Sequence, residues 1–201
     1  MTEDHYFAAV PSGDIRPRTV TFMVAGRVYQ LTAAAGVFSG DRLDPGTAIL
    51  LRKAPLPATR GGTYLDLGCG YGPIACVLAD TSPAATVYAV DVNERALDLV
   101  RQNAAEAGVA DRVIASTPDD VPDDVVFDEI WSNPPIRVGK RELHRMLLRW
   151  LPRLAPDGSA WLVVARNLGA DSLAAWLGEQ GWPTERFASQ RGYRILRIRD
   201  Y

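Results

Sequence analysis

The sequence is poor in the residues that build metal and redox sites. Among its 201 residues are two cysteines, Cys69 and Cys76, and two histidines, and there is no Cys-x-x-Cys pair. A structural zinc site draws about four Cys or His ligands from short, regular spacings, which this chain does not offer. We therefore expect no metal, and we interpret both cysteines as small buried thiols.

Long apolar runs and a strong excess of one charge are also missing. No stretch approaches the roughly 20 apolar residues of a membrane-spanning helix, and the first residues lack a basic region followed by an apolar one. These absences predict a cytoplasmic protein. The formal net charge of −2 excludes bulk electrostatic attraction to nucleic acid, so RNA binding would require a local basic patch. The oligomeric state is left open.

What is present has the size and apolar content of a single domain, since 47% of the residues are hydrophobic. Residues 18–24 and 27–32 are rich in β-forming side chains and flank a tight connection, which predicts a hairpin. A short helix is expected to begin near Asp44 or Pro45. The predicted organisation is one domain over residues 1–201, with the hairpin and its lead-in at 1–54 and the core at 55–201.

Beyond the lead-in, runs of strand length alternate with helical patterns. This alternation predicts a parallel sheet with helices on both faces, and the last two runs flank Arg191-Gly192 as a hairpin. We therefore predict an α/β, Rossmann-like, doubly wound and mostly parallel seven-stranded sheet with a terminal antiparallel hairpin. Pro156-Asp-Gly158 is expected to turn the chain into a strand. The expected strands are 64–67, 86–90, 112–115, 125–131, 160–165, 184–190 and 193–199, and the expected helices are 73–79, 93–107, 139–154 and 171–180.

The strand at 64–67 runs into a turn of alternate glycines, Asp66-Leu-Gly-Cys-Gly-Tyr-Gly72. Glycines let a backbone approach a ligand closely. The dinucleotide fingerprint Gly-x-Gly-x-x-Gly/Ala does not fit, because its last position falls on Pro73, and the Gly-Lys-Ser/Thr of a phosphate-binding loop is absent. The turn resembles motif I of the class I S-adenosylmethionine methyltransferases, in which it cradles the amino-acid part of the cofactor.

Asp91 closes the next strand, about 25 residues after Asp66. Both acids should lie at the carboxyl edge of the sheet, where open parallel sheets bind ligands. A carboxylate there can accept hydrogen bonds from both ribose hydroxyls, worth about 1.5–3 kcal/mol. The alternative is an acid that stabilises a helix N-terminus. The adenine is expected beside Val92, and Thr117, Ser116 and Asp119 are equally well placed to meet its amino group.

A second motif, Asn133-Pro134-Pro135-Ile136, follows the strand at 125–131. The two prolines donate no backbone N–H and fix φ, so the strand ends in a rigid corner that presents carbonyl oxygens and the Asn133 amide. The corner resembles motif IV, Asn/Asp-Pro-Pro-aromatic, of methyltransferases that modify a planar amino group in adenine, guanine or a glutamine amide. A purely structural Asn-Pro turn is the alternative.

The chemistry of that motif explains its residue types. The lone pair of an exocyclic amine is delocalised into its ring. Hydrogen bonds from its two protons to the Asn133 side-chain oxygen and the Pro134 carbonyl favour a pyramidal form that can attack the sulfonium methyl, and most of the rate comes from positioning and preorganisation. Ile136 replaces the usual aromatic and loses base stacking of about 1–3 kcal/mol. Arg137 is a candidate to compensate by stacking or by contacting a phosphate.

Among enzymes with this motif, the chain is most similar to the small-subunit ribosomal RNA guanine-N2 methyltransferases of the RsmC kind. Besides the two motifs, Gly36–Ser39 with Leu43–Thr47 resembles their lead-in, and Val164–Asn167 resembles the end of their fifth strand. The resemblance covers most of the chain. It implies that the lead-in folds over the cofactor, which makes Phe38 and Thr47 candidate lining residues.

These patterns predict an S-adenosylmethionine-dependent methyltransferase of an exocyclic amino group, with guanine N2 of ribosomal RNA as the first candidate. Adenine N6, a protein glutamine amide and a non-catalytic cofactor-binding module that clamps RNA are the alternatives. The predicted catalytic residues are Asn133, Pro134, Pro135 and Ile136; the predicted cofactor-binding residues are Phe38, Thr47, Asp66, Gly68, Cys69, Gly70, Asp91, Val92, Thr117 and Asn133; the predicted substrate-binding residues are Ile136, Arg137 and Lys140.

RNA contact would fall to a basic patch. Arg141, Arg145 and Arg149 share one face of the predicted helix at 139–154 and could bind phosphates in a salt-dependent way, although such faces are often merely solvated. Further candidates are Arg153 near the site and Arg186, Arg191, Arg194, Arg197 and Arg199 near the C-terminus.

Overall fold

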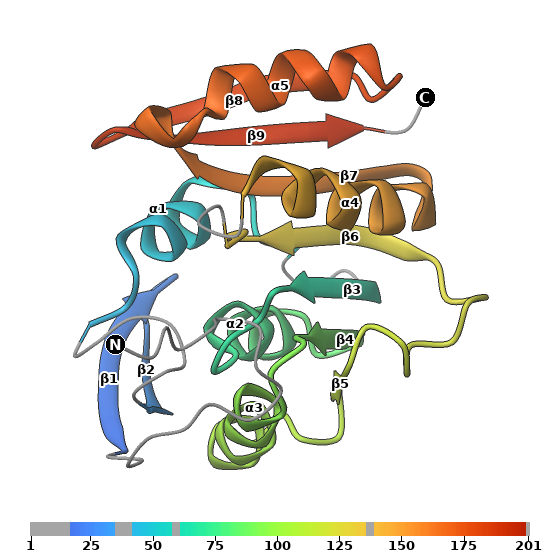
Figure 1. The fold of residues 1–201 in the computed structure, drawn as a ribbon. Helices are drawn as coiled ribbons and strands as arrows, with labels where there is room; N and C mark the ends of the chain where they lie inside the picture. The colour runs from blue at the N-terminus through green and yellow to red at the C-terminus, as the bar shows by residue number, and fades with distance from the viewer. Residues whose placement is uncertain (1–16, 35–41, 58–60, 136–138, 200–201) are drawn as a thin grey trace, which may run out of the picture.

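The chain is described by a computed structural model in which residues 17–34, 42–57, 61–135 and 139–199 are placed. These residues form a two-stranded sheet, β1-β2, and a seven-stranded sheet with the order β5-β4-β3-β6-β7-β9-β8 (Figure 1). The strands are β1 (Arg18–Val24), β2 (Arg27–Ala33), β3 (Gly62–Leu67), β4 (Ala85–Val90), β5 (Val113–Ser116), β6 (Phe127–Ser132), β7 (Leu154–Ala165), β8 (Thr184–Gln190) and β9 (Tyr193–Arg199). The helices are α1 (Pro45–Lys53), α2 (Pro73–Thr81), α3 (Glu94–Glu106), α4 (Lys140–Trp150) and α5 (Ala170–Glu179).

The large sheet is parallel from β5 to β7. Strand β9 enters antiparallel between β7 and β8. The chain moves outward from β3 to β4 and β5, then returns to the other side of β3 as β6. This reversal puts the carboxyl ends of β3 and β6 next to each other, and ligands bind at such a point in open α/β sheets. The predicted doubly wound sheet and its terminal hairpin are confirmed.

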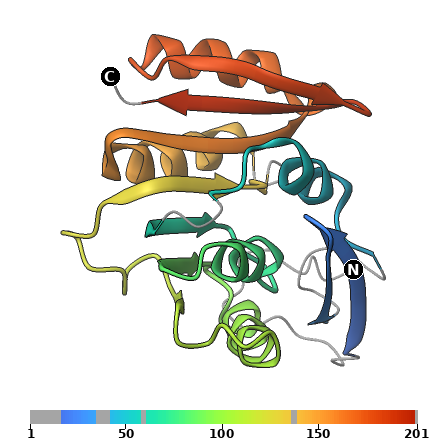
Figure 2. The ribbon, with the colours of Figure 1, turned by 180° about the vertical axis from the view of Figure 1, so that it is seen from behind.

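Helices cover both faces of the sheet (Figures 1 and 2). Helices α1, α2 and α3 pack on one face, and α4 and α5 on the other. Strands covered on both faces bury successive residues rather than alternate ones, as in β3, where residues 64–67 are all buried. Helix α4 needs one apolar stripe, and it buries Leu143, Leu147 and Trp150 at helical spacing. No helix among the described residues is long and apolar enough to cross a membrane.

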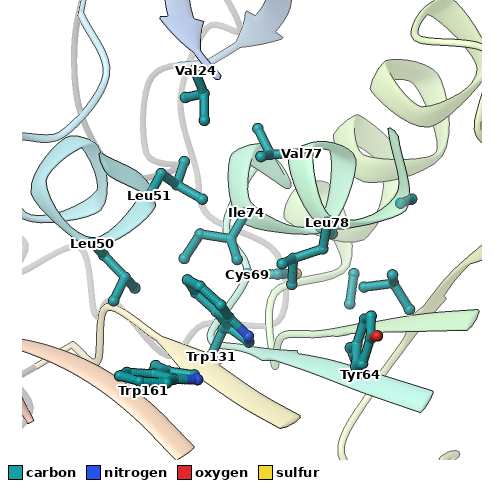
Figure 3. Packing of buried hydrophobic residues seen from close by; sticks show 14 of the residues in the cluster. Val24, Leu50, Leu51, Tyr64, Cys69, Ile74, Val77, Leu78, Trp131 and Trp161 are labelled. Carbon is teal, nitrogen blue, oxygen red and sulfur yellow. The ribbon is translucent and has the colours of Figure 1, made fainter. Parts of the chain in front are cut away.

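The core on the α1 side joins the lead-in to the sheet (Figure 3). Leu50 of α1 and Ile74 of α2 point toward Trp131 and Trp161 of the sheet, and all four side chains are buried. The two indole rings lie 6.0 Å apart between centroids. Burying a large apolar side chain contributes about 1.5–3 kcal/mol. Helix α1 is therefore held on the sheet by the packing of its buried side chains.

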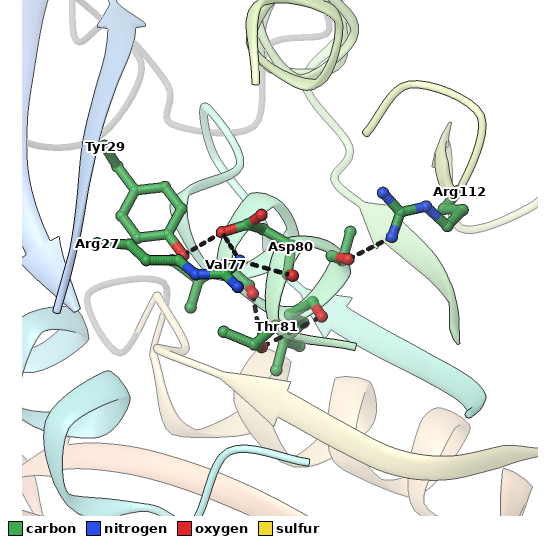
Figure 4. Close-up of polar contacts among 8 residues, drawn as sticks. Arg27, Tyr29, Val77, Asp80, Thr81 and Arg112 are labelled. Carbon is green, nitrogen blue, oxygen red and sulfur yellow. Dashed lines mark hydrogen bonds and ion pairs between the residues drawn. The ribbon is translucent and has the colours of Figure 1, made fainter. Parts of the chain in front are cut away.

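The β1-β2 hairpin was predicted from sequence, and it is held by polar contacts to α2 (Figure 4). The Tyr29 hydroxyl donates to Asp80 Oδ2 at 2.7 Å, and Arg27 Nη1 pairs with the same oxygen at 2.7 Å. Burial raises the pKa of Asp80, but the hydrogen bonds from Arg27 and Tyr29 outweigh it, so that pKa lies below its ordinary value. The carboxylate is thus charged at neutral pH and ties the hairpin to α2.

A second polar link comes from Asn103 of α3, whose side chain is fully buried. Its Nδ2 donates to the Thr32 carbonyl at 2.9 Å and to the Tyr71 carbonyl at 2.8 Å, while its Oδ1 accepts the Thr32 N–H at 2.7 Å. One amide therefore connects strand β2 to the glycine-rich turn that follows β3.

The predicted turn at Pro156-Asp-Gly158 is corrected by the structure. Strand β7 runs without interruption from Leu154 to Ala165. Its ladder with β6 shifts, because Leu154 pairs with Phe127 while Ser159 pairs with Glu129. The extra residues bulge out, with Asp157 at φ 64°. The residue types that signal a turn here accommodate a bulge inside one strand.

The helix predicted at 139–154 is shorter than expected. Helix α4 ends at Trp150, and a 3-10 turn, Leu151–Arg153, follows it. Pro152 has no N–H to donate to the carbonyl four residues earlier, so a regular α-helix does not continue through it.

We predict that Asn103→Ala destabilises the fold by about 2–4 kcal/mol, because it removes the partner of the buried Tyr71 carbonyl and of the two partly buried backbone groups of Thr32. Urea denaturation followed by circular dichroism measures this change. Gln102→Ala is the matched control, since Gln102 is an exposed neighbour that bonds Glu106, and its loss should stay within about 0.5 kcal/mol. Equal losses for the two variants would contradict the linking role of Asn103.

Candidate functional site

The glycine turn after β3 is anchored on the neighbouring strand. The N–H groups of Gly68 and Cys69 both donate to the Val90 carbonyl at the end of β4, at 2.8 and 3.1 Å. Gly72 has φ 85°, and a Cβ there would lie 3.0 Å from Val100 Cγ2, so the turn needs glycine at this point. Helix α2 begins directly afterwards with Pro73, whose fixed φ suits the first helical position.

Asp66 lies just before the turn and is buried, with 1% of its surface exposed. Its Oδ2 accepts the Ala75 N–H at 2.9 Å, and its Oδ1 has no hydrogen-bond partner among the described residues. Burial raises the pKa of Asp66 to about 8; the Ala75 hydrogen bond opposes this rise, and the Asp91 charge adds to it. An oxygen left without a donor in this way can take a cationic partner, which would restore the charged form.

Asp91 follows β4 and accepts backbone hydrogen bonds with both carboxylate oxygens, one from the glycine turn and one from the start of α3. Oδ2 accepts the Gly70 N–H at 3.0 Å, and Oδ1 accepts the Asn93 N–H at 2.9 Å. Burial raises the pKa of Asp91, and these two backbone hydrogen bonds oppose the rise. Each carboxylate oxygen has a further lone pair, so the group can still accept hydrogen bonds from a ligand. Val92 beside it is 42% exposed and adds apolar surface.

The three candidates for the adenine amino group lie at the end of β5 and on the loop that follows it. The Thr117 hydroxyl donates to Asp120 Oδ2 at 2.5 Å, and Asp119 Oδ1 accepts from Arg149 Nη1 at 2.9 Å. Ser116 ends β5, and its carbonyl accepts the Asp91 N–H at 3.3 Å. The structure therefore places this loop beside Asp91, while the choice among the three side chains stays a prediction.

The double-proline corner lies against the glycine turn. Strands β3 and β6 are parallel neighbours, and the Ser132 hydroxyl donates to the Leu67 carbonyl at 2.7 Å. A Cβ added to Gly68 would lie 3.6 Å from Pro135 Cδ, so the two segments lie close together. Both segments and the start of α1 line one pocket, whose residues are Leu43, Asp44, Thr47, Gly68, Cys69, Gly70, Tyr71, Pro73, Ile74 and Asn133.

The Asn133 amide is held by the lead-in. Its Nδ2 donates to Asp44 Oδ1 at 2.6 Å and to Thr47 Oγ1 at 3.0 Å. Asp44 is also the N-cap of α1, and the same oxygen accepts the Thr47 N–H at 3.0 Å. The sequence predicts Asp44 as the start of a helix, and its contact with Asn133 was missed because it joins segments 89 residues apart.

The remaining predicted residues divide into those that the structure describes and those that it does not. Thr47, Gly68, Cys69, Gly70 and Asn133 line the common pocket. Pro134 is buried beside it, and Lys140 is exposed at the first residue of α4. Phe38, Ile136 and Arg137 lie outside the described residues. Three further residues that were not predicted also line the pocket, namely Leu43, Tyr71 and Ile74. Tyr71 lies inside the glycine motif, so its position in the sequence could have identified it as a lining residue.

The cysteines have the character of buried thiols. Cys69 and Cys76 are both free and buried, and burial raises the pKa of the Cys76 thiol to about 12 and that of Cys69 well above its ordinary value. Among the described residues, no group of three or more His, Cys, Asp and Glu side chains could hold a metal ion.

Several of the arginines considered for RNA binding have partners within the protein. Arg149 pairs with Asp119, Arg194 pairs with Asp171, and Arg145 pairs with Glu142 at 2.6 Å. Arg153 lies over the rings of Phe127 and Trp150, and Arg197 lies over the ring of Trp161. Arg141 and Arg145 on α4 expose 96% and 81% of their side chains, so this face remains the stronger candidate for a phosphate contact.

Comparisons with known proteins place this geometry in a family. The sequence model of the methyltransferase small domain matches residues 28–197. The uncharacterized protein YbxB of Bacillus subtilis is 32% identical over 198 residues, which is 98% of each chain. Ribosomal RNA small subunit methyltransferase C of Aeromonas hydrophila is 41% identical over 127 residues, which cover 62% of this chain and 35% of that protein.

A solved structure with the same fold is the 16S rRNA N2 G1207 methyltransferase RsmC of T. thermophilus, in complex with AdoMet and guanosine. It superposes with a TM-score of 0.75 at 23% identity and covers 96% of this chain and 52% of that chain. The chain thus spans between 35% and 52% of the length of these RsmC proteins, whereas it spans nearly all of YbxB. The predicted resemblance to S-adenosylmethionine-dependent methyltransferases is confirmed: the chain belongs to the methyltransferase small domain family.

Proposed function

We propose that the protein transfers a methyl group from S-adenosylmethionine to the exocyclic N2 of a guanine in small-subunit ribosomal RNA. The observation that carries the proposal is the common pocket, in which the glycine turn and the Asn133 amide line the same space. A cofactor held by the turn would have its methyl group within reach of an amine held at the double-proline corner. The proposed unit is the single domain over residues 1–201.

The residues present fit the cofactor. S-adenosylmethionine carries an ammonium, a ribose diol and an adenine, and it supplies an electrophilic methyl group when bound. The buried Oδ1 of Asp66, without a donor among the described residues, suits the ammonium. Asp91 keeps lone pairs for the ribose hydroxyls, the exposed face of Val92 suits the adenine ring, and the turn at Gly68 and Gly70 leaves room for the chain between them.

The corner fits an amine nucleophile. The Asn133 Nδ2 already donates to Asp44 and Thr47, so Oδ1 is the amide atom left to accept one amine proton. The Pro134 carbonyl is the proposed acceptor of the second proton. Two acceptors favour the pyramidal amine with its lone pair directed at the methyl carbon, and no strong base is needed because the amine becomes acidic once methylated. Ile136, Arg137 and Lys140 remain the proposed contacts to the base and its phosphates.

The choice of guanine in RNA is supported by what the relatives are named for. The RsmC proteins methylate small-subunit ribosomal RNA, and the T. thermophilus protein acts on guanine N2. The exposed guanidinium groups of Arg141 and Arg145 offer contacts to phosphate. A protein glutamine amide is the second candidate, because its planar NH₂ group would make the same two hydrogen bonds at the corner.

We predict that the protein methylates guanine N2 in isolated small-subunit RNA or in the assembled subunit, and that Asn133→Ala lowers kcat by about 10²–10³-fold with the cofactor Kd changed by less than about threefold. Labelled cofactor, nuclease digestion and mass spectrometry identify the product. Gln180→Ala, an exposed amide at the end of α5, is the control. Label in protein glutamine would replace the RNA proposal, and cofactor binding without any transfer would leave a non-catalytic module.

Asp91→Ala should raise the Kd of S-adenosylmethionine by about 10- to 100-fold, since it removes charge-assisted hydrogen bonds worth about 1.5–3 kcal/mol. Calorimetric titration measures the Kd. Glu94→Ala is the matched control, because Glu94 is an exposed acid in the first turn of the same helix, α3. If both variants bind the cofactor like the original protein, Asp91 serves the helix N-terminus and the ribose lies elsewhere.

The raised pKa of Asp66 predicts a linked proton. Below pH 8 the folded protein holds a proton that the unfolded chain releases above about pH 4, so the stability of the cofactor-free protein falls as pH rises through this window. An ammonium beside Asp66 lowers that pKa, so binding at about pH 6.5 should release close to one proton. Calorimetry in two buffers of different ionisation enthalpy counts the released protons.

Two controls define the source of this proton. Asp66→Asn keeps an acceptor for the Ala75 N–H and cannot ionise, so it should release none. Methylthioadenosine lacks the ammonium, and its binding should release none even to the original protein. Proton release that persists in Asp66→Asn would assign it to another group.

A further inference from the structure

We propose that Asp44 is a positioning residue that fixes the orientation of the Asn133 amide and strengthens its carbonyl oxygen as an acceptor. This inference rests on the proposed function, because it concerns the group that would hold the amine. It assigns to the lead-in a part in the reaction that differs from covering the cofactor.

Asp44 sits on the chain at the point where α1 begins. Its Oδ1 lies 2.6 Å from Asn133 Nδ2 and 3.0 Å from the Thr47 backbone nitrogen. The Thr47 hydroxyl is the second acceptor of the Asn133 amide, at 3.0 Å. Asp44, Thr47 and Asn133 all line the common pocket, so this network stands at the place where the proposed reaction occurs.

The carboxylate decides which way the amide points. An ionised carboxylate can accept hydrogen bonds but cannot donate them, so the side of the amide that faces Asp44 has to be the NH₂ group. The reverse orientation would set two oxygens against each other at hydrogen-bond distance. With Nδ2 fixed toward Asp44, Oδ1 is the amide atom left to act as an acceptor before any substrate arrives.

The charge of Asp44 has a second effect. Hydrogen bonds to an ionised acceptor are about twice as strong as neutral ones, and linked hydrogen bonds polarise one another. Donation from Nδ2 to an anion moves electron density toward Oδ1, which improves Oδ1 as an acceptor for an amine proton. An uncharged acceptor at position 44 would keep the orientation but lose part of this polarisation.

Close packing leaves the network little freedom. A Cβ on Gly46 would lie 2.9 Å from Asp44 Oδ1, 3.1 Å from Tyr193 Cε1 and 3.3 Å from Asn133 Oδ1. The absence of a side chain at Gly46 thus allows α1, β9 and the double-proline corner to meet. Helix α1 itself is fixed by buried side chains such as Leu50, so Asp44 is presented from a rigid element.

A capping role alone is the competing explanation, and two substitutions separate it from positioning. Asp, Asn and Ser cap helices about equally well, so Asp44→Asn and Asp44→Ser should both keep the melting temperature within about 2 °C. Asp44→Ser is too short to reach Asn133 and should lower kcat by about 10- to 100-fold. Asp44→Asn keeps a neutral acceptor and should lower kcat by a smaller factor, roughly 3- to 10-fold.

The experiment measures kcat, the cofactor Kd and the melting temperature for both variants. Asp98→Asn, an exposed acid paired with Arg101 on α3, is the control and should behave like the original protein. The graded loss of kcat with an unchanged Kd supports positioning. A kcat within twofold of the original in Asp44→Ser, or a loss of cofactor affinity as large as the loss of kcat, overturns it.

A nuclear magnetic resonance measurement on the cofactor-free protein keeps this test separate from the proposed function. The Asn133 side-chain amide signals, identified by their loss in Asn133→Ala, should lie downfield and exchange slowly with water. In Asp44→Ser they should move upfield and exchange faster; unchanged signals overturn the inference. If they respond to Asp44 while the original protein methylates neither RNA nor protein, the coupling stands and the proposed function fails.

Discussion

The site depends on the alignment of the carboxyl ends of β3 and β6. These parallel neighbours lie where the strand order of the sheet reverses, and the buried Ser132 hydroxyl joins them through the Leu67 carbonyl. From this junction the glycine turn and the double-proline corner leave the sheet together, and Gly68 lies close to Pro135. If the two strand ends were offset by one residue, every side chain that follows would face the wrong side of the sheet, and neither motif could serve the other.

The elements that precede the large sheet, β1, β2 and α1, also contribute to the site. Helix α1 packs against Trp131 and Trp161 through buried leucine side chains and brings Asp44 and Thr47 to the pocket (Figure 3). The β1-β2 hairpin is tied to α2 through Asp80 (Figure 4), and it is tied to α3 through Asn103. Asn103 also donates to the Tyr71 carbonyl. The same side chain therefore links the hairpin to the glycine turn. The N-terminal elements are therefore part of the site's framework.

The sequence predicted most of the fold because its signals are local. Alternating strand and helix patterns, the cap at Asp44, the proline that opens α2 and the hairpin about Arg191-Gly192 all depend on near neighbours along the chain. The failures have physical causes as well. Pro156-Asp-Gly158 has turn chemistry, but pairing of β7 with β6 on both sides turned it into a bulge, and Pro152 ended α4 early.

The glycine turn and the double-proline corner could be predicted as one site, because each follows a parallel strand and so lies at the same edge of the sheet. Contacts between segments that are distant in the sequence could not be predicted in this way. The pairing of Asp44 with Asn133 leaves no pattern within either segment, since both residue types are also ordinary cap and turn residues. Likewise, the spacing of arginines on α4 could not reveal the ion pair between Arg149 and Asp119, because Asp119 lies on the loop between β5 and β6.

The ring of Tyr193 lies beside Gly46 at the start of α1, since a Cβ added to Gly46 would lie 3.1 Å from Tyr193 Cε1 and 3.3 Å from Asn133 Oδ1. The surroundings of Asn133 are therefore built from α1, the carboxyl end of β6 and the β8-β9 hairpin, which are far apart in the sequence. They become complete only when all three elements have packed together, so the formation of this part of the site is coupled to the folding of the whole sheet.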